Sequence, residues 1–468
     1  MTTSEARMVT SAQDSQVSSA GAQELRTATT RESMRFWKNL VQDPLTAYDR
    51  VFAQFGDTVS LWMPPRRKFF VLSRPEYVNH VLVTANDKYV RAFTYKPLRA
   101  LLGTGLLTSD GEPWARHRKV VQPVFTHRNI RSFGGEMATA VRRRVDGWDE
   151  DGLVDGMLEM RALTMDVVGR VLFGIELAHE AVKTGDAIAQ VQRAAIVTSM
   201  LPLEDPKTTR RVLKVFPKIS NGLSYLDQLV GGIIEERKGR PLEEKSRNMI
   251  DLLLGADNEH RLTEQEIFDE VVTMILAGHE TTANALTWAL VLLSQYPSAR
   301  ERLEQEVDEV LGGRDPEVAD LEKLKWTDAV ISEAMRLYPP GWGIEREAMA
   351  DDEVGGIEIP AGSTVSMPVY LMHRHPEFWP NPEGFDPERF LEPQNSDRPR
   401  NSYIPFGVGK RVCIGAGFAM LEATLALATI ANTHRLDLLG GTDLRPRADM
   451  SLRPRGEVPM RISRRPGR

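Results

Sequence analysis

Cysteine is almost absent from this chain, since Cys413 is the only one in 468 residues. A single cysteine cannot close a disulfide within the chain, and it cannot supply the several thiolates of a structural zinc or iron–sulfur site. Two interpretations of Cys413 remain: an inert buried thiol, or a single thiolate with a chemical role. The residues around it have to decide between them.

Long apolar runs are also missing. No stretch of eighteen apolar residues occurs, so no transmembrane helix is expected. The N-terminus lacks the charged-then-apolar pattern of a signal peptide. The net charge of −6 gives no sign of nucleic-acid binding. With 41% hydrophobic and 26% charged residues the composition is that of an ordinary globular protein, and a cytoplasmic location is the default expectation.

Large apolar residues are scarce in residues 1–32, which are rich in Ser, Thr, Ala and Gln. We expect this segment to be a disordered lead and residues 33–468 to form a single domain. A helical pattern from about Ser33 to Ala53 is followed by β-type runs at Thr58–Trp62 and Lys68–Leu72. Most of the later segments have helical patterns. The predicted fold class is therefore mainly α with a smaller β portion.

The surroundings of Cys413 favour a chemical role. Lys410 and Arg411 place positive charge beside the thiol, and a helix-forming sequence begins at Gly417, so the amides and dipole of a helix N-terminus favour an anion here. A thiolate held in this way is a natural axial ligand for haem iron. Bare backbone on both sides of the sulfur suits the close approach of a flat, bulky group, and four glycines provide it: Gly407, Gly409, Gly415 and Gly417.

Five residues of this loop match the haem-binding signature of the cytochrome P450 family: Phe406, Gly409, Arg411, Cys413 and Gly415. The chain resembles that family from about residue 33 onwards. The resemblance implies the cytochrome P450 fold with a long central helix over the haem, haem b as the cofactor, and Cys413 as the iron ligand. It also implies a monooxygenase that uses O2 and two electrons to insert one oxygen atom into a small molecule.

A long helix is predicted from Thr263, where Glu266 completes a capping pattern, to about Tyr296. Midway along it, residues 277–282 read AGHETT, in which a glycine and two adjacent threonines oppose helix formation. Such a break in a strong helix suggests a site, although a packing glycine with solvated polar neighbours explains the same pattern.

In the cytochrome P450 family an acid followed by an alcohol stands in this run, and Glu280 and Thr281 match that pair. Cleavage of dioxygen requires protons, and a carboxylate beside a hydroxyl can relay them from solvent. Ala277 is expected to leave space above the haem. Glu280 and Thr281 are therefore the predicted catalytic residues.

Trp114 and Arg118 lie four residues apart in the run WARHRK and share a helix face. A buried aromatic beside a solvated cation explains this pattern, and so does a clamp on a carboxylate, because the indole N–H and the guanidinium both donate. We expect Arg116 and His117 to face outward. The family resemblance implies that four side chains hold the two haem propionates: Trp114, Arg118, Arg346 and Arg411.

Glu333 and Arg336 lie three residues apart and share a helix face. As an exposed pair they would contribute under about 1 kcal/mol. In the family this ExxR pair is buried and is completed by a basic residue from a downstream loop, which here is Arg389 in the run FDPERF. The resemblance implies that these three residues form a structural network that positions the loop of Cys413.

Tyr89 to Asp110 shows no clear period and is predicted as a long loop, a kind of segment that is often functional. In the family this region lines the substrate pocket. The apolar pocket fits a lipid, terpenoid, steroid or polyketide equally well, and the AGHETT run loosely resembles the fatty-acid and lipid hydroxylase branch. Trp342 either narrows the pocket or is a core tryptophan. The predicted pocket residues are Leu101, Leu102, Leu106, Leu107, Ile275, Leu276, Trp342 and Ile344.

No flavin- or iron–sulfur-binding sequence follows the domain, so electrons are expected from a separate ferredoxin or flavodoxin-type donor with its NAD(P)H reductase. Arg116, Lys119 and Lys410 are candidates for a positive docking surface. Two alternatives to a monooxygenase remain: a haem-thiolate isomerase or dehydratase, and a non-catalytic protein that binds or senses a ligand through haem. The intact pair Glu280–Thr281 argues against both.

Overall fold

The structure of the protein is a computed structural model that describes residues 25–63, 67–95, 98–99, 102–149, 151–199, 206–239, 248–255 and 261–465. The first 24 residues of the predicted disordered lead lie outside this range. Within it, β1 (Arg26–Thr27) pairs with β2 and α1 begins at Thr30. The predicted start of the folded domain at residue 33 is therefore too late, because the capping box of Thr29 and Glu32 opens α1 earlier.

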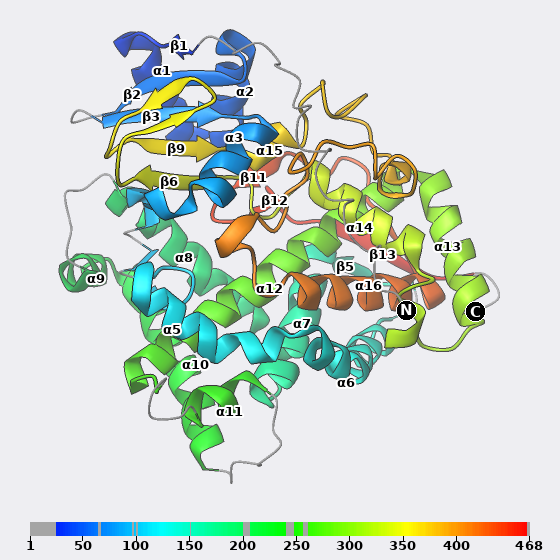
Figure 1. Ribbon diagram of the computed structural model, residues 1–468. Coiled ribbons are helices and arrows are strands. Elements are labelled where there is room, and N and C mark those ends of the chain that lie inside the picture. The colour runs from blue at the N-terminus through cyan, green and yellow to red at the C-terminus, as the bar shows by residue number, and fades with distance from the viewer. Residues whose placement is uncertain are drawn as a thin grey trace, which may run out of the picture.

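Helices make up most of the described chain, as predicted, and a β-sheet lies at one side of the molecule (Figure 1). The principal helices are α1 (Thr30–Gln42), α2 (Pro44–Phe55), α3 (Pro75–Asn79), α5 (Gly111–Val121), α6 (His127–Asp146), α7 (Gly156–Val168), α8 (Ala181–Ser199), α9 (Pro206–Lys214), α10 (Pro217–Lys238), α11 (Met249–Leu254), α12 (Glu264–Gln295), α13 (Pro297–Leu311), α14 (Lys325–Leu337), α15 (Val369–Met372) and α16 (Ala416–Thr433).

The largest sheet has six strands in the order β1-β2-β3-β9-β6-β4, with β2 (Thr58–Met63), β3 (Arg67–Leu72), β4 (Tyr89–Arg91), β6 (Ile344–Ala348) and β9 (Thr364–Met367). The two predicted β-type runs are confirmed as β2 and β3. Three smaller sheets contain β5 (Leu153–Asp155), β7 (Asp352–Val354), β8 (Ile357–Ile359), β10 (His434–Leu438), β11 (Pro446–Ala448), β12 (Leu452–Pro454) and β13 (Pro459–Arg464).

The predicted loop from Tyr89 to Asp110 begins with a strand instead, because β4 pairs antiparallel with β6. The register places Arg91 of β4 opposite Arg346 of β6. Pairing between segments some 250 residues apart brings two arginines together, and no local pattern indicates this.

The long helix α12 runs through the middle of the molecule, as predicted from its capping pattern (Figure 1). Thr263 and Glu266 form the capping box that starts it, and most of its 32 residues are buried. α12 packs against α7 and α16. By length and composition α16 is the one described helix that could cross a membrane, but 72% of it is buried inside the molecule, as in the core helix of a globular domain.

Candidate active site around Cys413

Cys413 lies between a 3-10 turn, η9 (Gly409–Arg411), and the start of α16. Its backbone N–H donates to the carbonyl of Phe406 at 2.9 Å. Gly409 has a φ of +77°, and a Cβ on it would lie 2.0 Å from the carbonyl oxygen of Leu82. A glycine is therefore required at this point of the loop. The close fit constrains the backbone of the loop just before Cys413.

The thiol of Cys413 borders open space, although the loop lies deep in the protein. Burial raises the pKa of the Cys413 thiol, and a backbone hydrogen bond from Gly415 and the charge of Arg118 oppose that shift only in part. A free thiol at this position would be neutral. A metal ion removes the proton from a thiol that it binds, so the site suits a metal ligand better than a free nucleophile.

On α12, Ala277 is exposed in the middle of a helix whose neighbouring residues are mostly buried. Thr281 is partly exposed, and its Oγ1 donates to the carbonyl of Ala277 at 2.6 Å. Gly278, by contrast, packs against α7, because a Cβ there would lie 3.0 Å from Val168. The expected space beside the helix is thus bordered by Ala277 and Thr281, while Gly278 serves helix packing.

Glu280 points from α12 towards α7, where its Oε1 lies 3.5 Å from Nη2 of Arg161. Glu280 is buried, and so is its neighbour His279, whose Nδ1 lies 2.8 Å from the carbonyl of Ile275. Burial lowers the pKa of His279. The predicted acid therefore sits beside a cation, and a neutral imidazole fills the adjacent position.

Buried arginines gather next to the Cys413 loop. Arg411 donates to the carbonyl of Ser109 at 2.6 Å, and its guanidinium lies 4.5 Å from the ring centroid of Trp114. Arg118 donates to the carbonyl of Val412 at 3.2 Å. The predicted set of Trp114, Arg118 and Arg411 is thus brought together.

Arg91 belongs to the same group, and sequence reasoning missed it. Burial, followed by the charges of Arg91 and Arg346, lowers the pKa of Arg411 to about 9. Among the described residues, Asp110 is the one carboxylate within ion-pair distance of these arginines, 3.4 Å from Arg411 and 4.0 Å from Arg91. The Nε of Arg91 is buried without a hydrogen-bond partner. This cation cluster, defined as Arg91, Arg118, Arg346 and Arg411, lacks the negative charge that would balance it.

A thiol that borders open space and a cation cluster short of carboxylates are the two features that a haem requires, one for its iron and the other for its propionates. The donor set therefore fits the group that the sequence implies. The signal that could have identified Arg91 is the register of β4 on β6, which the sequence alone does not contain.

Glu333 and Arg336 are fully buried and form a bidentate pair, with both N···O distances 2.7 Å. Arg389 approaches Glu333 from the η8 turn (Pro387–Phe390) at 3.3 Å, and the N–H of Asp386 donates to the same carboxylate at 2.9 Å. The three predicted members of the network are thus in contact.

The predicted pocket residues differ in where the structure places them. Leu101 lies outside the described residues. Trp342 is part of the core, because its Nε1 donates to the carbonyl of Asp449 at 2.8 Å and its ring lies 6.2 Å from that of Tyr48. Partly exposed positions are Leu107 and Ile344, and buried ones are Leu102, Leu106, Ile275 and Leu276.

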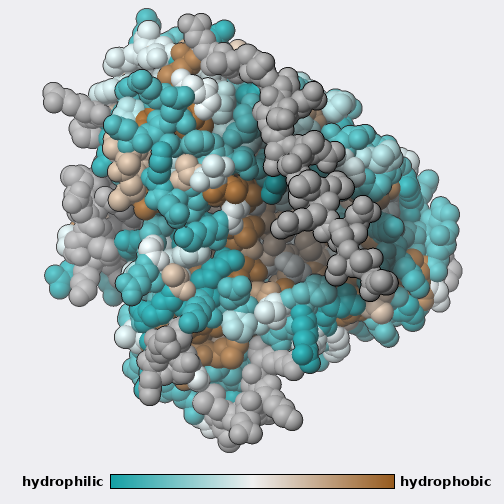
Figure 2. Space-filling view, viewed as in Figure 1, coloured by the Kyte–Doolittle hydropathy of each residue, from teal (hydrophilic) through white to brown (hydrophobic). Residues whose placement is uncertain are grey.

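Ile344 is the pocket candidate that lies beside the cysteine loop, since a Cβ on Gly407 would be 3.6 Å from its Cδ1. On the face shown in Figure 2, apolar side chains gather in a hollow near the middle, where α12 passes in Figure 1. An apolar access region is consistent with the predicted class of substrate.

The prediction that Arg116 and His117 face outward is wrong. His117 is fully buried, with Nδ1 2.5 Å from Oε1 of Glu270, and Arg116 pairs with Glu266. The reason is that α12 covers this side of α5 and supplies acidic partners from its first turns. Of the predicted docking cations, Lys119 is exposed, whereas Lys410 lies 3.3 Å from Asp87.

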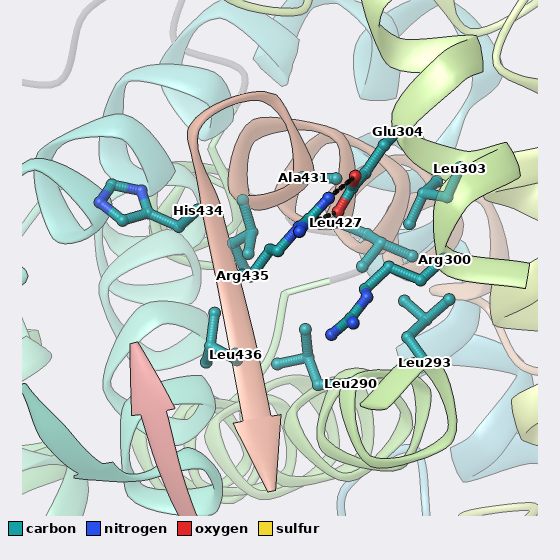
Figure 3. A pocket seen from close by; sticks show the side chains of 11 residues that line it. Leu290, Leu293, Arg300, Leu303, Glu304, Leu427, Ala431, His434, Arg435 and Leu436 are labelled. Carbon is teal, nitrogen blue, oxygen red and sulfur yellow. Dashed lines mark hydrogen bonds and ion pairs between the residues drawn. The ribbon is translucent and has the colours of Figure 1, made fainter. Parts of the chain in front are cut away.

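A separate small cavity lies between α12, α13, α16 and β10 (Figure 3). Its volume is about 20 Å³, enough for one water molecule and far too small for a substrate. The ion pair of Glu304 and Arg435 crosses it at 2.5 Å. This cavity is lined mainly by leucine, isoleucine and alanine side chains and shares no lining residue with the site at Cys413.

Comparison with known proteins agrees with this geometry. The family model described as Cytochrome P450 matches residues 34–458. The chain is similar to cyclooctatin synthase of Streptomyces melanosporofaciens, with 38% identity over 85% of this chain and 86% of that protein. It is also similar to cyclooctat-9-en-7-ol 5-monooxygenase of the same organism, with 32% identity over 83% and 84%. Pentalenene oxygenase of Streptomyces avermitilis is 30% identical over 84% and 86%.

A crystal structure of a cytochrome P450, CYP102L1, has the same fold, with a TM-score of 0.78, 24% identity and coverage of 90% of this chain and 95% of that one. The chain belongs to the cytochrome P450 family. It is a haem-thiolate monooxygenase of that family.

Proposed function

We propose that the protein inserts one oxygen atom from O2 into an apolar terpenoid. The observation that carries the proposal is the thiol of Cys413, which borders open space on a tightly packed loop. Beside it lies the cation cluster, which has too few carboxylates to balance its positive charge. We propose that Cys413 is the axial ligand of haem b and that Trp114, Arg91, Arg118, Arg346 and Arg411 hold its propionates. When bound, the haem supplies the activation of O2.

The proton-handling roles of Glu280 and Thr281 form part of this proposal. The hydroxyl of Thr281 donates to Ala277, so its oxygen lone pairs remain available to accept a hydrogen bond from water. Glu280 is within reach of the Arg161 cation, and a carboxylate that exchanges between this partner and water can carry protons inward. Ala277 leaves the side of α12 open at this point.

The choice of a terpenoid among the four predicted classes rests on relatives. Three of them are named for cyclooctatin, cyclooctat-9-en-7-ol and pentalenene. An apolar wall of leucine and isoleucine side chains fits such molecules. A binding screen of cyclic terpenes against fatty acids, steroids and polyketides, read by the shift of haem absorbance, tests it. Tight binding and oxygenation of a fatty acid, with no terpene bound, would refute this choice of class.

Separate redox proteins complete the proposal. We propose a ferredoxin or flavodoxin-type donor with its NAD(P)H reductase, docked near Lys119 and Lys410. Product formation that depends on NADPH and on this reductase system supports a monooxygenase. Conversion of a peroxide without external electrons would instead favour an isomerase or dehydratase, and ligand binding without turnover would favour a sensor. The cytoplasmic location stays a prediction.

A further inference from the structure

Two neighbouring acids of α12 fasten the loop that carries Leu106 and Leu107. The backbone N–H of Thr104 donates to Oδ2 of Asp269 at 2.7 Å. The N–H of Leu106 donates to Oε1 of Glu270, also at 2.7 Å. The loop from Gly103 to Ser109, here named the pocket loop, is thus attached to the central helix by hydrogen bonds from its own backbone.

The pocket loop lies against α12 without room for side chains at two positions. Gly103 has a φ of +73°, and a Cβ on it would lie 2.0 Å from Cγ of Asp269. A Cβ on Gly105 would lie 2.5 Å from Oγ1 of Thr273. The sequence therefore keeps glycine where the loop must approach the helix closely. The loop therefore packs directly against Asp269 and Thr273 of α12.

Glu270 has a second partner, which comes from a third element. Nδ1 of His117, on α5, lies 2.5 Å from the same Oε1 that accepts from Leu106, and both side chains are fully buried. The other oxygen, Oε2, is buried without a hydrogen-bond partner in the described part of the chain. A buried carboxylate with an unsatisfied oxygen is costly unless a positive charge compensates it. His117 is the group placed to do so.

The groups that face His117 decide its charge. From α12 these are Glu270 and Glu266, the latter 3.4 Å from Nε2. Arg116 of α5 is neutralised by Glu266, and Asp251 of α11, which packs against α5, pairs with Arg237 of α10. Burial opposes the charged imidazole, but the hydrogen bonds and charges of Glu270 and Glu266 outweigh it, so the pKa of His117 is raised above 6.5.

We propose that Glu270 is a positioning residue of the substrate pocket, which fixes the pocket loop to α12, and that the positive charge of protonated His117 stabilises this contact. His117 shares α5 with Trp114 and Arg118, so the same contact joins the pocket loop to the helix that holds the cofactor. This positioning role rests on the proposed function, because it assumes that the pocket loop lies on the substrate side of the haem site.

The sign of the pH dependence follows from the raised pKa of His117. The contribution of the charged pair is fully present below pH 6.5 and is lost as the pH rises through the raised pKa. In the haem-loaded wild-type protein, amide hydrogen exchange of the pocket loop should therefore accelerate more steeply with rising pH than exchange in α16. If both segments follow the same pH profile, the proposal is overturned, and this measurement needs no variant.

The variant Glu270→Gln keeps an oxygen that accepts from Leu106 but removes the charge that pairs with His117. We expect exchange of the pocket loop to become about tenfold faster at pH 6, and its extra pH dependence to disappear. The matched control is Glu264→Gln, on the same helix but exposed and paired with Lys238. Identical exchange in the two variants would overturn the positioning role.

Ligand binding separates this inference from the proposed function. The bulky azole clotrimazole should contact the pocket loop, whereas imidazole needs the iron alone. We expect Glu270→Gln to weaken clotrimazole binding about fivefold and to leave imidazole binding unchanged, because a loosened wall is less preorganised. Unchanged clotrimazole affinity counts against the positioning role. Absence of any azole binding by wild-type protein would instead refute the haem-thiolate site, while the exchange experiment would still report on the loop.

Discussion

Arg336 and Arg411 are both buried arginines, and the numbers of partners that surround them differ. Arg336 uses all five N–H groups of its guanidinium, two on Glu333 and three on backbone carbonyls. Arg411 has one carbonyl, Ser109, and a shared carboxylate, Asp110 at 3.4 Å. Burial and other arginines lower the pKa of Arg411 to about 9, whereas Arg336 has the carboxylate of Glu333 beside it in a bidentate pair.

The difference separates two uses of a buried cation. In the first use, all donors of the guanidinium are occupied and a carboxylate lies beside it. Such a group stabilises the fold and has no free donor for a ligand. A cluster of guanidinium groups that repel each other and have few acceptors makes the fold less stable by itself and is stabilised when an anion binds. The network of Glu333, Arg336 and Arg389 belongs to the first kind. The cation cluster of Arg91, Arg118, Arg346 and Arg411 belongs to the second.

The largest loss of stability is expected from a change in the network of Glu333, Arg336 and Arg389. Arg336→Ala leaves Glu333 buried without its bidentate partner, so the free energy of unfolding should fall by about 3–5 kcal/mol, and haem should not be retained. Chemical denaturation and haem content are the measurements. The control is Arg302→Ala, which removes a half-exposed partner of Glu388 and should cost under about 1 kcal/mol. Equal losses in both variants would mean that burial of the network contributes little.

The sequence was sufficient for features whose parts lie close together in the chain. The capping box of Thr263 and Glu266 predicted the start of α12. Glu333 and Arg336 share a helix face because they are three residues apart. In each case, local geometry determines the contact.

Features that depend on pairing between distant segments were missed. Arg91 joins the cation cluster because β4 pairs with β6, and His117 is buried because acidic residues of α12 cover it. A helix pattern shows which face of α5 is apolar but not that a second face will meet charged partners. The start of the fold before residue 33 was missed for a similar reason, since β1 gains its hydrogen bonds from β2.

The second prediction concerns the thiol that the cation cluster flanks. Cys413→His should abolish the thiolate-type carbon-monoxide absorption band completely. The side chain borders open space, so the free energy of unfolding of the haem-free protein should change by less than about 0.5 kcal/mol. A spectrum of the reduced, carbon-monoxide-treated variant and a denaturation curve are sufficient. Survival of the band would disprove the ligand assignment.

The third prediction tests whether the cation cluster lowers the stability of the haem-free protein. Arg91→Met removes a buried cation whose Nε makes no hydrogen bond and lies 4.0 Å from Asp110. Its hydrogen bond to the carbonyl of Leu106 is also long, at 3.5 Å. The haem-free protein should be as stable as the wild type or more stable, because repulsion with Arg346 and Arg411 is relieved. Haem release should be about tenfold faster, because one charge-assisted contact is lost.

The control for this variant is Arg67→Met, on the same sheet, where a 3.2 Å pair with Glu347 is 39% exposed on the arginine side. It should leave haem release unchanged. Both readouts are needed: thermal melting of the haem-free proteins, and transfer of haem to a competing apoprotein. Loss of stability in haem-free Arg91→Met, comparable with that of Arg336→Ala, would remove the distinction between the two kinds of buried arginine.

The smallest effect on stability is expected at Thr281. Its hydroxyl donates a hydrogen bond to Ala277, and the same oxygen can still accept one from a ligand. Its donated hydrogen bond stays within α12, so Thr281→Ala should melt and retain haem like the wild type. Consumption of NADPH should continue, while more of it yields hydrogen peroxide and less yields product, since proton delivery to dioxygen is impaired. Thr287→Ala is the matched control, because the hydroxyl of Thr287 makes the same kind of bond, 2.7 Å to Ala283, at a fully buried position. Wild-type coupling of NADPH to product in Thr281→Ala would assign its hydroxyl to the helix alone.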